Sequence, residues 1–458
     1  MKSGEIKKYR PSLARSFLFG AINYNEIVKK VEKFIFYLLL FSIPFESRLI
    51  LKTYSFPFNE WMSVFLYGSD IFIGALFLLW ILKKDRNLKW SKSDFFLLGF
   101  LVLSSASIIW AQQRQLAFFQ SVKLAEFIWL YWYIKLQAGK VFTLRGAMLA
   151  VAVSGFLQAI VAIFQYVKQA SVGLGFLGET VLNPYLPGIA VVVANGEKFL
   201  RSYGTTLHPN VLAGFLFLAI YSFYFLYLYK DEFLTWPKSL LFYSVLLFGF
   251  FLTFSRTIIF LWGLGGVIRF IIILVKPKFW ILAVKLSVRI VMVVTVTFIV
   301  SGLFLLFLYP QVLSRIKISG SDQSIDLRIF YAKSAIETIP SNLLGVGAGN
   351  FVNNLADIHP ELPVWQFQPV HNIFLLIGSE TGIGGLALFI LFLFFLAKEY
   401  KKNTQFGQFY HYSFFIIFLF IGFFDHFIWT SQPGRMMFWT VLGLISYVSR
   451  KEPDNYII

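Results

Sequence analysis

The side chains best suited to chemistry are one histidine and three arginines. His371 lies in the segment PVHN and opens an apolar run, and Arg256 lies in TFSRT between two apolar runs. Arg201 begins RSYGTTLHPN, and Arg328 lies in a stretch of helical periodicity. A histidine ahead of a helix faces the positive end of the helix dipole, which favours the neutral imidazole that can accept a proton from a hydroxyl. Several guanidinium groups at one level form a site for a di-anion such as pyrophosphate.

Each of these residues also has a simpler explanation. A lone histidine in such a place commonly caps a helix, and an arginine at a membrane edge commonly extends its head group to the surface. Arg256 departs from that explanation, because a two-residue turn between spans needs no cation. The flanking Ser255 and Thr257 can cap the next helix and add hydrogen-bond donors.

The acidic residues and the other histidines give little support for a metal. A site for Mg²⁺ or Mn²⁺ would use paired carboxylates, and Asp322 and Asp326 are close in sequence without forming an Asp-x-Asp pair. His208 and His359 could join His371 as ligands, but none of them has the i, i+4 spacing of a helical metal site. His208 stands before a proline and indicates a helix start. The sequence therefore predicts no metal and no cofactor.

Composition places these residues in a membrane protein. Of the 458 residues 58% are hydrophobic and 14% are charged, with a mean hydropathy of +0.70, whereas soluble domains have about 25% charged residues. The apolar runs are about 20 residues long, which matches a bilayer core. Because lipid cannot satisfy an open backbone, we expect an all-α polytopic membrane protein. The absence of cysteine excludes disulfides and thiolate metal sites.

Twelve transmembrane helices are expected, with a long extracytoplasmic loop before the tenth. The expected order is a cytoplasmic basic tail (1–33), helices one to nine (34–308), the long loop (309–370), helices ten to twelve (371–449) and a cytoplasmic tail (450–458). The expected spans are 34–51, 61–82, 94–111, 119–136, 146–167, 209–229, 239–255, 257–275, 280–308, 371–397, 410–429 and 436–449. Apolar residues at helical spacing predict an amphipathic helix over 325–339 in the long loop.

The charge of +18 fits this topology. Lys and Arg concentrate in the loops assigned to the inside, which places both termini in the cytoplasm and leaves no nucleic-acid surface. Within one span, Lys123 and Glu126 stand three apart and are expected to pair. The turn LGVGAGN (344–350) lacks the strand-to-helix context of a nucleotide site, so its glycines predict close backbone approach.

The order of these motifs resembles that of the O-antigen ligase and polymerase family. RSYGTTLHPNVLAGF, TFSRT opening a span, LLGVGAGNF, and HN followed by FLLIGSETGIGGL carry the resemblance over roughly residues 200–390. It implies a GT-C-like architecture in the bacterial cytoplasmic (inner) membrane, with the active site on the periplasmic side. It also implies that His371 is the general base, that Arg256 and Arg328 bind a pyrophosphate, and that Arg201 assists them.

The resemblance further implies a metal-independent inverting glycosyl transfer in lipopolysaccharide biosynthesis, with His208 and Asn372 as secondary candidates. The donor would be an undecaprenyl-pyrophosphate-linked glycan within membrane lipid. The acceptor would be lipid A–core for a ligase, which we favour on the LGVGAGNF…HN match, or another lipid-linked glycan for a polymerase. The alternative of another class is a polysaccharide flippase or transporter, for which internal repeats and polar groups along a path are expected.

Overall fold

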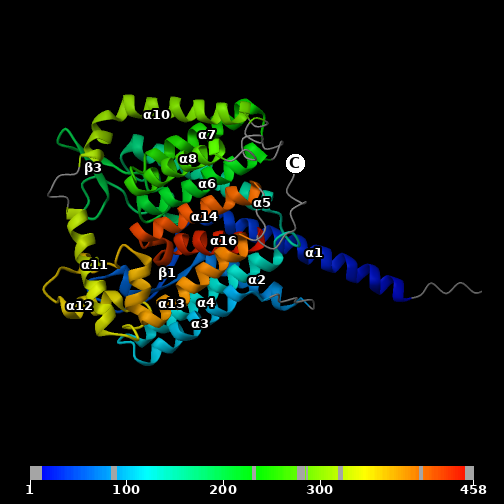
Figure 1. The fold of residues 1–458 in the computed structure, drawn as a ribbon, viewed down its shortest axis with the longest axis horizontal. Helices are drawn as coiled ribbons and strands as arrows, with labels where there is room; N and C mark the ends of the chain where they lie inside the picture. The colour runs from blue at the N-terminus through cyan, green and yellow to red at the C-terminus, as the bar shows by residue number, and fades with distance from the viewer. Residues whose placement is uncertain are drawn as a thin grey trace, which may run out of the picture.

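The computed structural model describes residues 13–83, 90–229, 234–275, 284, 287–317, 323–401 and 406–448. Most of the regular structure within these residues is α-helical (Figure 1). The helices are α1 (Leu13–Phe41), α2 (Gly68–Ile81), α3 (Lys92–Ala106), α4 (Arg114–Gln137), α5 (Leu144–Lys168), α6 (Pro209–Tyr229), α7 (Trp236–Phe251), α8 (Arg256–Val275), α10 (Ser287–Ile316), α11 (Gln323–Ser341), α12 (Phe351–Ile358), α13 (Ile373–Lys401), α14 (Phe406–Phe424), α15 (Phe427–Thr430) and α16 (Gln432–Val448).

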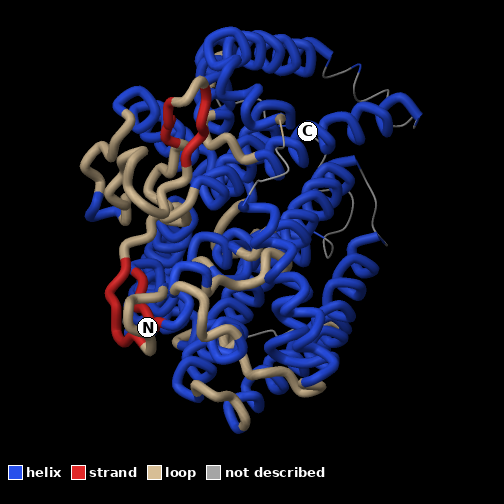
Figure 2. The backbone as a smooth tube through the Cα atoms, turned by 90° about the vertical axis from the view of Figure 1, so that its left-hand side faces the viewer, coloured by secondary structure: helices blue, strands red, loops and turns tan. Residues whose placement is uncertain are grey.

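Two small antiparallel sheets lie in the connections between helices. Strand β1 (Arg48–Thr53) pairs with β2 (Ser63–Tyr67), and β3 (Val191–Ala194) pairs with β4 (Glu197–Leu200). Both hairpins lie at the end of the helical bundle that also carries α11 and α12, on the left of Figure 1, and Figure 2 looks onto this end. We call it the loop end. Short 3₁₀ turns complete the connections: η1 (Glu60–Met62), η2 (Ser107–Ile109), η3 (Gly175–Leu177) and η4 (Val364–Gln366).

Among the described residues, six helical segments are long and apolar enough to cross a membrane: Lys92–Ile109, Leu144–Lys168, Pro209–Leu228, Arg256–Val275, Ser287–Ile316 and Ile373–Tyr400. Three shorter apolar helices accompany them: Gly68–Ile81, Trp236–Phe251 and Phe414–Phe424. Their length and composition indicate a polytopic membrane protein, because each can satisfy its own backbone while it presents apolar side chains to lipid.

Helix α6 is the central element of the bundle. Of its apolar window 89% is buried, and it packs against α5, α7, α8 and α16. Small residues allow this close packing, since a side chain on Gly155 of α5 would collide with Ala219 of α6. The buried helix begins directly after His208 and therefore holds that segment in a fixed place at the loop end.

Several expected spans have the wrong bounds. The segment expected to span over 61–82 begins with η1 and β2, and only its part from Gly68 onward is α-helical. The structure has no single helix over 34–51: α1 begins at Leu13 and ends at Phe41, and residues 48–53 form β1. Pro44 follows the end of α1 and cannot continue a helix. Similarly, α10 continues past residue 308 to Ile316, with a bend at Leu308 two residues before Pro310.

Two local predictions are confirmed. The amphipathic helix expected over 325–339 is α11. Lys123 pairs with Glu126, with 2.9 Å between Nζ and Oε2, and it also pairs with Asp70 of α2 at 2.5 Å, a contact between helices that the sequence did not predict.

Candidate active site

A histidine and an aspartate from different helix ends meet at the loop end. His371 precedes α13, and its Nδ1 lies 3.5 Å from Oδ1 of Asp425. Asp425 follows the last residue of α14, where the expected span 410–429 breaks before α15. The Asp425 side chain is 9% exposed and that of His371 is 21% exposed. A buried carboxylate beside a more accessible imidazole is an arrangement suited to proton transfer.

Asn210 connects this pair to a buried arginine. Its Nδ2 donates to Oδ2 of Asp425 at 2.8 Å, and its Oδ1 accepts from Nη2 of Arg201 at 2.8 Å and from Oγ of Ser255 at 3.1 Å. Arg201 also donates from Nε to the carbonyl oxygen of Thr253 at 2.8 Å. Two hydrogen bonds therefore fix the Arg201 guanidinium group, and the Asn210 side chain links it to Asp425.

The other two predicted arginines act on this cluster through their charge. Arg328 of α11 acts electrostatically on Asp425 and His426, and Arg256, the first residue of α8, acts on Arg201. Of the three arginines predicted from the sequence, Arg201 and Arg328 thus interact electrostatically with Asp425, and Arg256 interacts with Arg201. It adds Arg315 near the end of α10, whose charge also acts on Arg201.

The two secondary candidates have different surroundings. His208 lies just before α6, and its Nδ1 accepts a hydrogen bond from the backbone N–H of Asn210 at 3.1 Å. Asn372 caps α13, since its Oδ1 accepts from the backbone N–H groups of Phe374 and Leu375 at 2.9 and 3.0 Å. The capping explanation for His371 is therefore wrong, because its neighbour makes the capping contacts.

Burial and charge determine the protonation of this cluster. Burial would raise the pKa of Asp425, but the adjacent His371 imidazole, at 3.5 Å, holds it well below its usual range. Burial lowers the pKa of His426 to about 3, with a further contribution from His371. Burial also lowers the pKa of Arg201 to about 9, assisted by Arg315. At neutral pH the cluster therefore contains one carboxylate among several guanidinium groups, an excess of positive charge.

One group of residues in the described part of the chain has the residue types and spacing of a metal site. His371, Asp425 and His426 each offer a ligand atom within 4.8 Å of the others. His426 Nδ1 already lies 2.7 Å from Oγ1 of Thr430, and the surrounding guanidinium groups repel a cation. His359, weighed as a ligand from the sequence, instead lies 3.3 Å from Glu361.

The glycine-rich turn has the close contacts that the sequence predicted. Gly345, Gly347 and Gly349 all have positive φ, at 79°, 101° and 69°. A side chain on Gly347 would collide with Ala111, and one on Gly349 would meet Gln120 of α4. The turn can therefore pack directly on α4 and α13 only because these three positions carry no side chain.

Three groups of the site were missed in the sequence: Asp425, His426 and Asn210. Asp425 and His426 interrupt the apolar run FIGFFDHFIW. A charged residue inside a membrane span is costly and commonly functional, so this interruption was an available signal. Asn210 offered no such signal, because an asparagine after His-Pro is common at a helix start.

The fold and the site together define a polytopic helical membrane protein with a histidine–aspartate pair surrounded by arginines at one end of its bundle. Residues 240–390, about a third of the chain, match the family model described as O-antigen ligase. The matched range includes Arg256, Arg328 and His371. The family covers O-antigen ligases and polymerases, which transfer glycans and use lipid-linked glycan substrates. A comparison with curated proteins finds no match.

Proposed function

We propose that this protein is a membrane glycosyltransferase that moves a glycan from an undecaprenyl-pyrophosphate carrier to an acceptor hydroxyl. The observation that carries the proposal is the 3.5 Å approach of His371 Nδ1 to the buried Asp425 carboxylate, within a cluster of arginines. The pair supplies a base for the acceptor, and the arginines supply positive charge for the leaving group.

In the proposed reaction, His371 accepts the proton of the acceptor hydroxyl through Nε2, the nitrogen that does not face Asp425. The Asp425 carboxylate fixes the tautomer of the ring and stabilises the imidazolium that forms. The acceptor oxygen forms a bond to the anomeric carbon while the bond from that carbon to the pyrophosphate oxygen breaks. Attack opposite the leaving group inverts the configuration and releases undecaprenyl pyrophosphate.

The arginines divide into two kinds of role in this proposal. Arg256 and Arg328 contact the pyrophosphate and stabilise the charge that develops as it leaves. Arg201 assists them with its charge and also holds Asn210 against Asp425. His208 supports Asn210 through its backbone, and Asn372 fixes the start of α13 so that His371 is held in place.

The reaction is proposed to need no metal, because guanidinium groups supply the positive charge that Mg²⁺ or Mn²⁺ supplies in other transferases. The excess of positive charge around Asp425 supports this assignment. The three residues with metal-site spacing give a specific alternative, which chelation tests directly: activity that disappears in EDTA and returns with added metal would favour a metal at His371, Asp425 and His426.

For the membrane, we propose twelve spans with both termini in the cytoplasm and the loop end outside, from the distribution of Lys and Arg. The proposed acceptor is lipid A–core, which makes the protein a ligase. A second lipid-linked glycan as acceptor would make it a polymerase.

The experiment that tests this function uses the purified protein in lipid bilayers, with a labelled undecaprenyl-pyrophosphate oligosaccharide and EDTA throughout. Label should move from the carrier to lipid A–core or to a second lipid-linked glycan, and the productive acceptor distinguishes ligase from polymerase. Failure to transfer to either acceptor, with the glycan instead appearing across the bilayer, would contradict the proposal and support a flippase.

A further inference from the structure

A basic pocket lies at the end of the bundle opposite the loop end, where α1 leaves the other helices (Figure 1). Two turns of α1 (residues 26–33) form one wall, and the turn between α4 and α5 (residues 139–143) forms the other. Its volume of about 340 Å³ falls within the range of about 300–1,000 Å³ of small-molecule sites. None of the proposed active-site residues lines it, so a ligand bound here is separate from the glycan substrates.

Four lysines line the basic pocket. Lys29, Lys30 and Lys33 belong to α1, and Lys140 belongs to the α4–α5 turn. The lining contains one carboxylate, Glu26, so four positive charges stand against one negative charge. Among the described residues, no ion pair joins any of these lysines to a carboxylate. The pocket therefore has the charge of a site for an anion.

The next acidic residue of α1 is not available to these lysines. Glu32 is buried and pairs with Lys83, with 2.6 Å between Nζ and Oε2, and it accepts a hydrogen bond from the Tyr133 hydroxyl at 3.0 Å. Lys29 and Lys33 stand four positions apart, a spacing at which like charges on a helix repel each other. A bound anion would offset this repulsion.

The floor of the basic pocket is fixed by contacts that do not involve its lysines. The Tyr37 hydroxyl accepts a hydrogen bond from the backbone N–H of Thr143 at 3.1 Å, and Phe36 stacks on Phe142 with 3.8 Å between ring centroids. Gly139, with a φ of 76°, donates from its N–H to the carbonyl oxygen of Phe142 at 2.7 Å. These contacts tie the α4–α5 turn to α1, so the pocket is formed without a ligand.

An apolar stripe on α1 accompanies the basic pocket. Ile27, Val31 and Phe34 recur at helical spacing and are 58%, 44% and 66% exposed. The same two turns of helix thus offer ammonium groups and exposed apolar side chains. An anionic phospholipid has the complementary parts, a phosphodiester head group and acyl chains. A soluble phosphate compound would use the lysines alone and leave the apolar stripe uncovered.

We propose that the basic pocket binds the phosphodiester head group of an anionic phospholipid through Lys29, Lys30, Lys33 and Lys140. The acyl chains of this lipid lie along the apolar stripe of α1. Basic pockets between transmembrane helices are a known way to hold acidic lipid head groups. The inference is independent of the proposed glycosyl transfer, because no residue of the loop end takes part in it.

The test measures binding to the full chain in detergent micelles. The labelled probes are dioctanoyl phosphatidylglycerol, dioctanoyl phosphatidylcholine and glycerophosphoglycerol, which is the soluble head group of the first lipid. Phosphatidylglycerol should bind at least about tenfold more tightly than the other two probes. The triple variant Lys29→Gln/Lys30→Gln/Lys33→Gln should raise its Kd roughly 100-fold, since each lysine near an anionic lipid contributes about fivefold in affinity.

The matched control is the triple variant Lys92→Gln/Lys238→Gln/Lys398→Gln. It removes the same charge from exposed lysines at the same end of the bundle that do not line the basic pocket. The Kd of phosphatidylglycerol for this control should stay within about twofold of the wild-type value. The single variant Lys140→Gln should raise the Kd about fivefold, which keeps the test decisive if the triple variant of α1 folds poorly.

Three results would overturn the inference. An equal loss of affinity in the two triple variants would show a diffuse attraction to the whole basic surface. Equal binding of phosphatidylglycerol and phosphatidylcholine would show that the anionic charge is not recognised. Binding of glycerophosphoglycerol as tight as that of the lipid would show a site for a soluble phosphate compound.

Discussion

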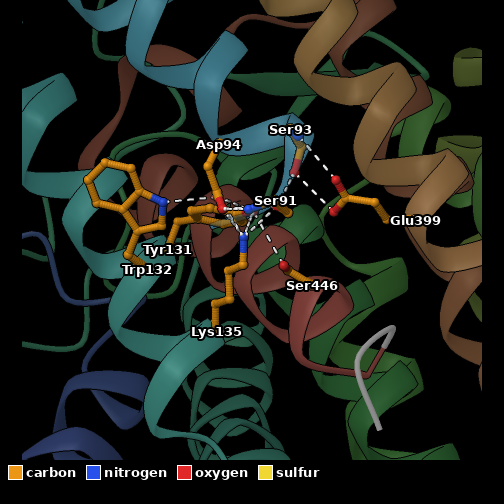
Figure 3. A network of polar contacts seen from close by, with 8 residues as sticks. All are labelled: Ser91, Ser93, Asp94, Tyr131, Trp132, Lys135, Glu399 and Ser446. Atoms are coloured by element: carbon orange, nitrogen blue, oxygen red, sulfur yellow. Dashed lines mark hydrogen bonds and ion pairs between the residues drawn. The ribbon is translucent and has the colours of Figure 1, made fainter. Parts of the chain in front are cut away.

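Two buried polar clusters lie at opposite ends of the same helices. The loop-end cluster contains the start of α13, while the other lies where α3 begins and where α4, α13 and α16 approach their far ends (Figure 3). In the second cluster Lys135 contacts both oxygens of Asp94 at 2.5 Å. Trp132 Nε1 and the backbone N–H of Ser91 donate to the same carboxylate at 3.0 and 2.7 Å.

The difference between the clusters is their charge balance. Asp94 and Lys135 neutralise each other among matched donors and acceptors, which makes a network that joins helices. Asp425 instead interacts with Arg201 and Arg328, and Arg256 acts on Arg201, so the loop end keeps an excess of positive charge. Similar residue types thus join helices where positive and negative charges balance. Where positive charge is in excess, they form an environment suited to an anionic substrate.

The largest predicted effect is on stability, in the balanced cluster. Lys135→Met leaves the Asp94 carboxylate buried without its cation, which should lower the free energy of unfolding by roughly 3–5 kcal/mol. Thermal unfolding in detergent measures this loss, with the exposed Lys140→Met as control. The Lys135→Met protein that remains folded should transfer glycan at the wild-type rate per molecule. A loss of turnover in that folded protein would show that the Asp94–Lys135 cluster has more than a structural role.

The next effect is on donor binding, in the unbalanced cluster. Arg328→Ala removes a guanidinium group near Asp425 and should raise the donor KM about tenfold to a hundredfold, the value of one or two charge-assisted hydrogen bonds. Unfolding temperature should change little, because this cluster carries surplus positive charge. Arg114→Ala, at an exposed arginine that begins α4, is the matched control, and an equal effect there would contradict a specific anion site.

A smaller effect is expected from the residue that joins the arginine to the carboxylate. Asn210→Ala removes one donor to Asp425 and leaves Arg201 without that acceptor. We expect kcat to fall about tenfold with a smaller change in the acceptor KM, because the mutation disturbs the orientation of Asp425. Steady-state kinetics separate the two constants, and a change in KM alone would show that Asn210 does not position the base.

The last predicted effect is a change of stability with pH, which is small at any single pH step. Burial raises the pKa of Glu46, just before β1, to about 8. Between about pH 4.5 and 8 the folded protein keeps a proton that the unfolded chain releases, so stability should decrease as pH rises through that window. One group contributes at most about 1.4 kcal/mol per pH unit. Unfolding temperatures of Glu46→Gln should follow a flatter profile, and an unchanged profile would contradict a protonated Glu46.

The sequence identified polar residues that gather at the loop end better than it identified their contacts. His371 and the arginines stood out because polar groups at the ends of apolar runs are visible without a structure. The glycine-rich turn and α11 were predictable because positive φ and helical spacing leave local signatures.

The partners of those residues depend on the tertiary fold. Asp425 is 54 positions after His371 in the chain, and only the packing of α13 and α14 brings the two together. The end of α1 was also missed, because the apolar residues of 34–51 fit a helix and a strand equally well. Pro44 was the local signal for that break.

The most direct test of the central claim compares two histidines of the loop end in the labelled-glycan transfer assay with EDTA present. His371→Ala should slow transfer by roughly 10²- to 10⁴-fold, the usual contribution of a general base, while His359→Ala should keep the wild-type rate. Both proteins should unfold at nearly the same temperature. Transfer by His371→Ala at the wild-type rate would remove His371 and its carboxylate partner from the mechanism and contradict the account.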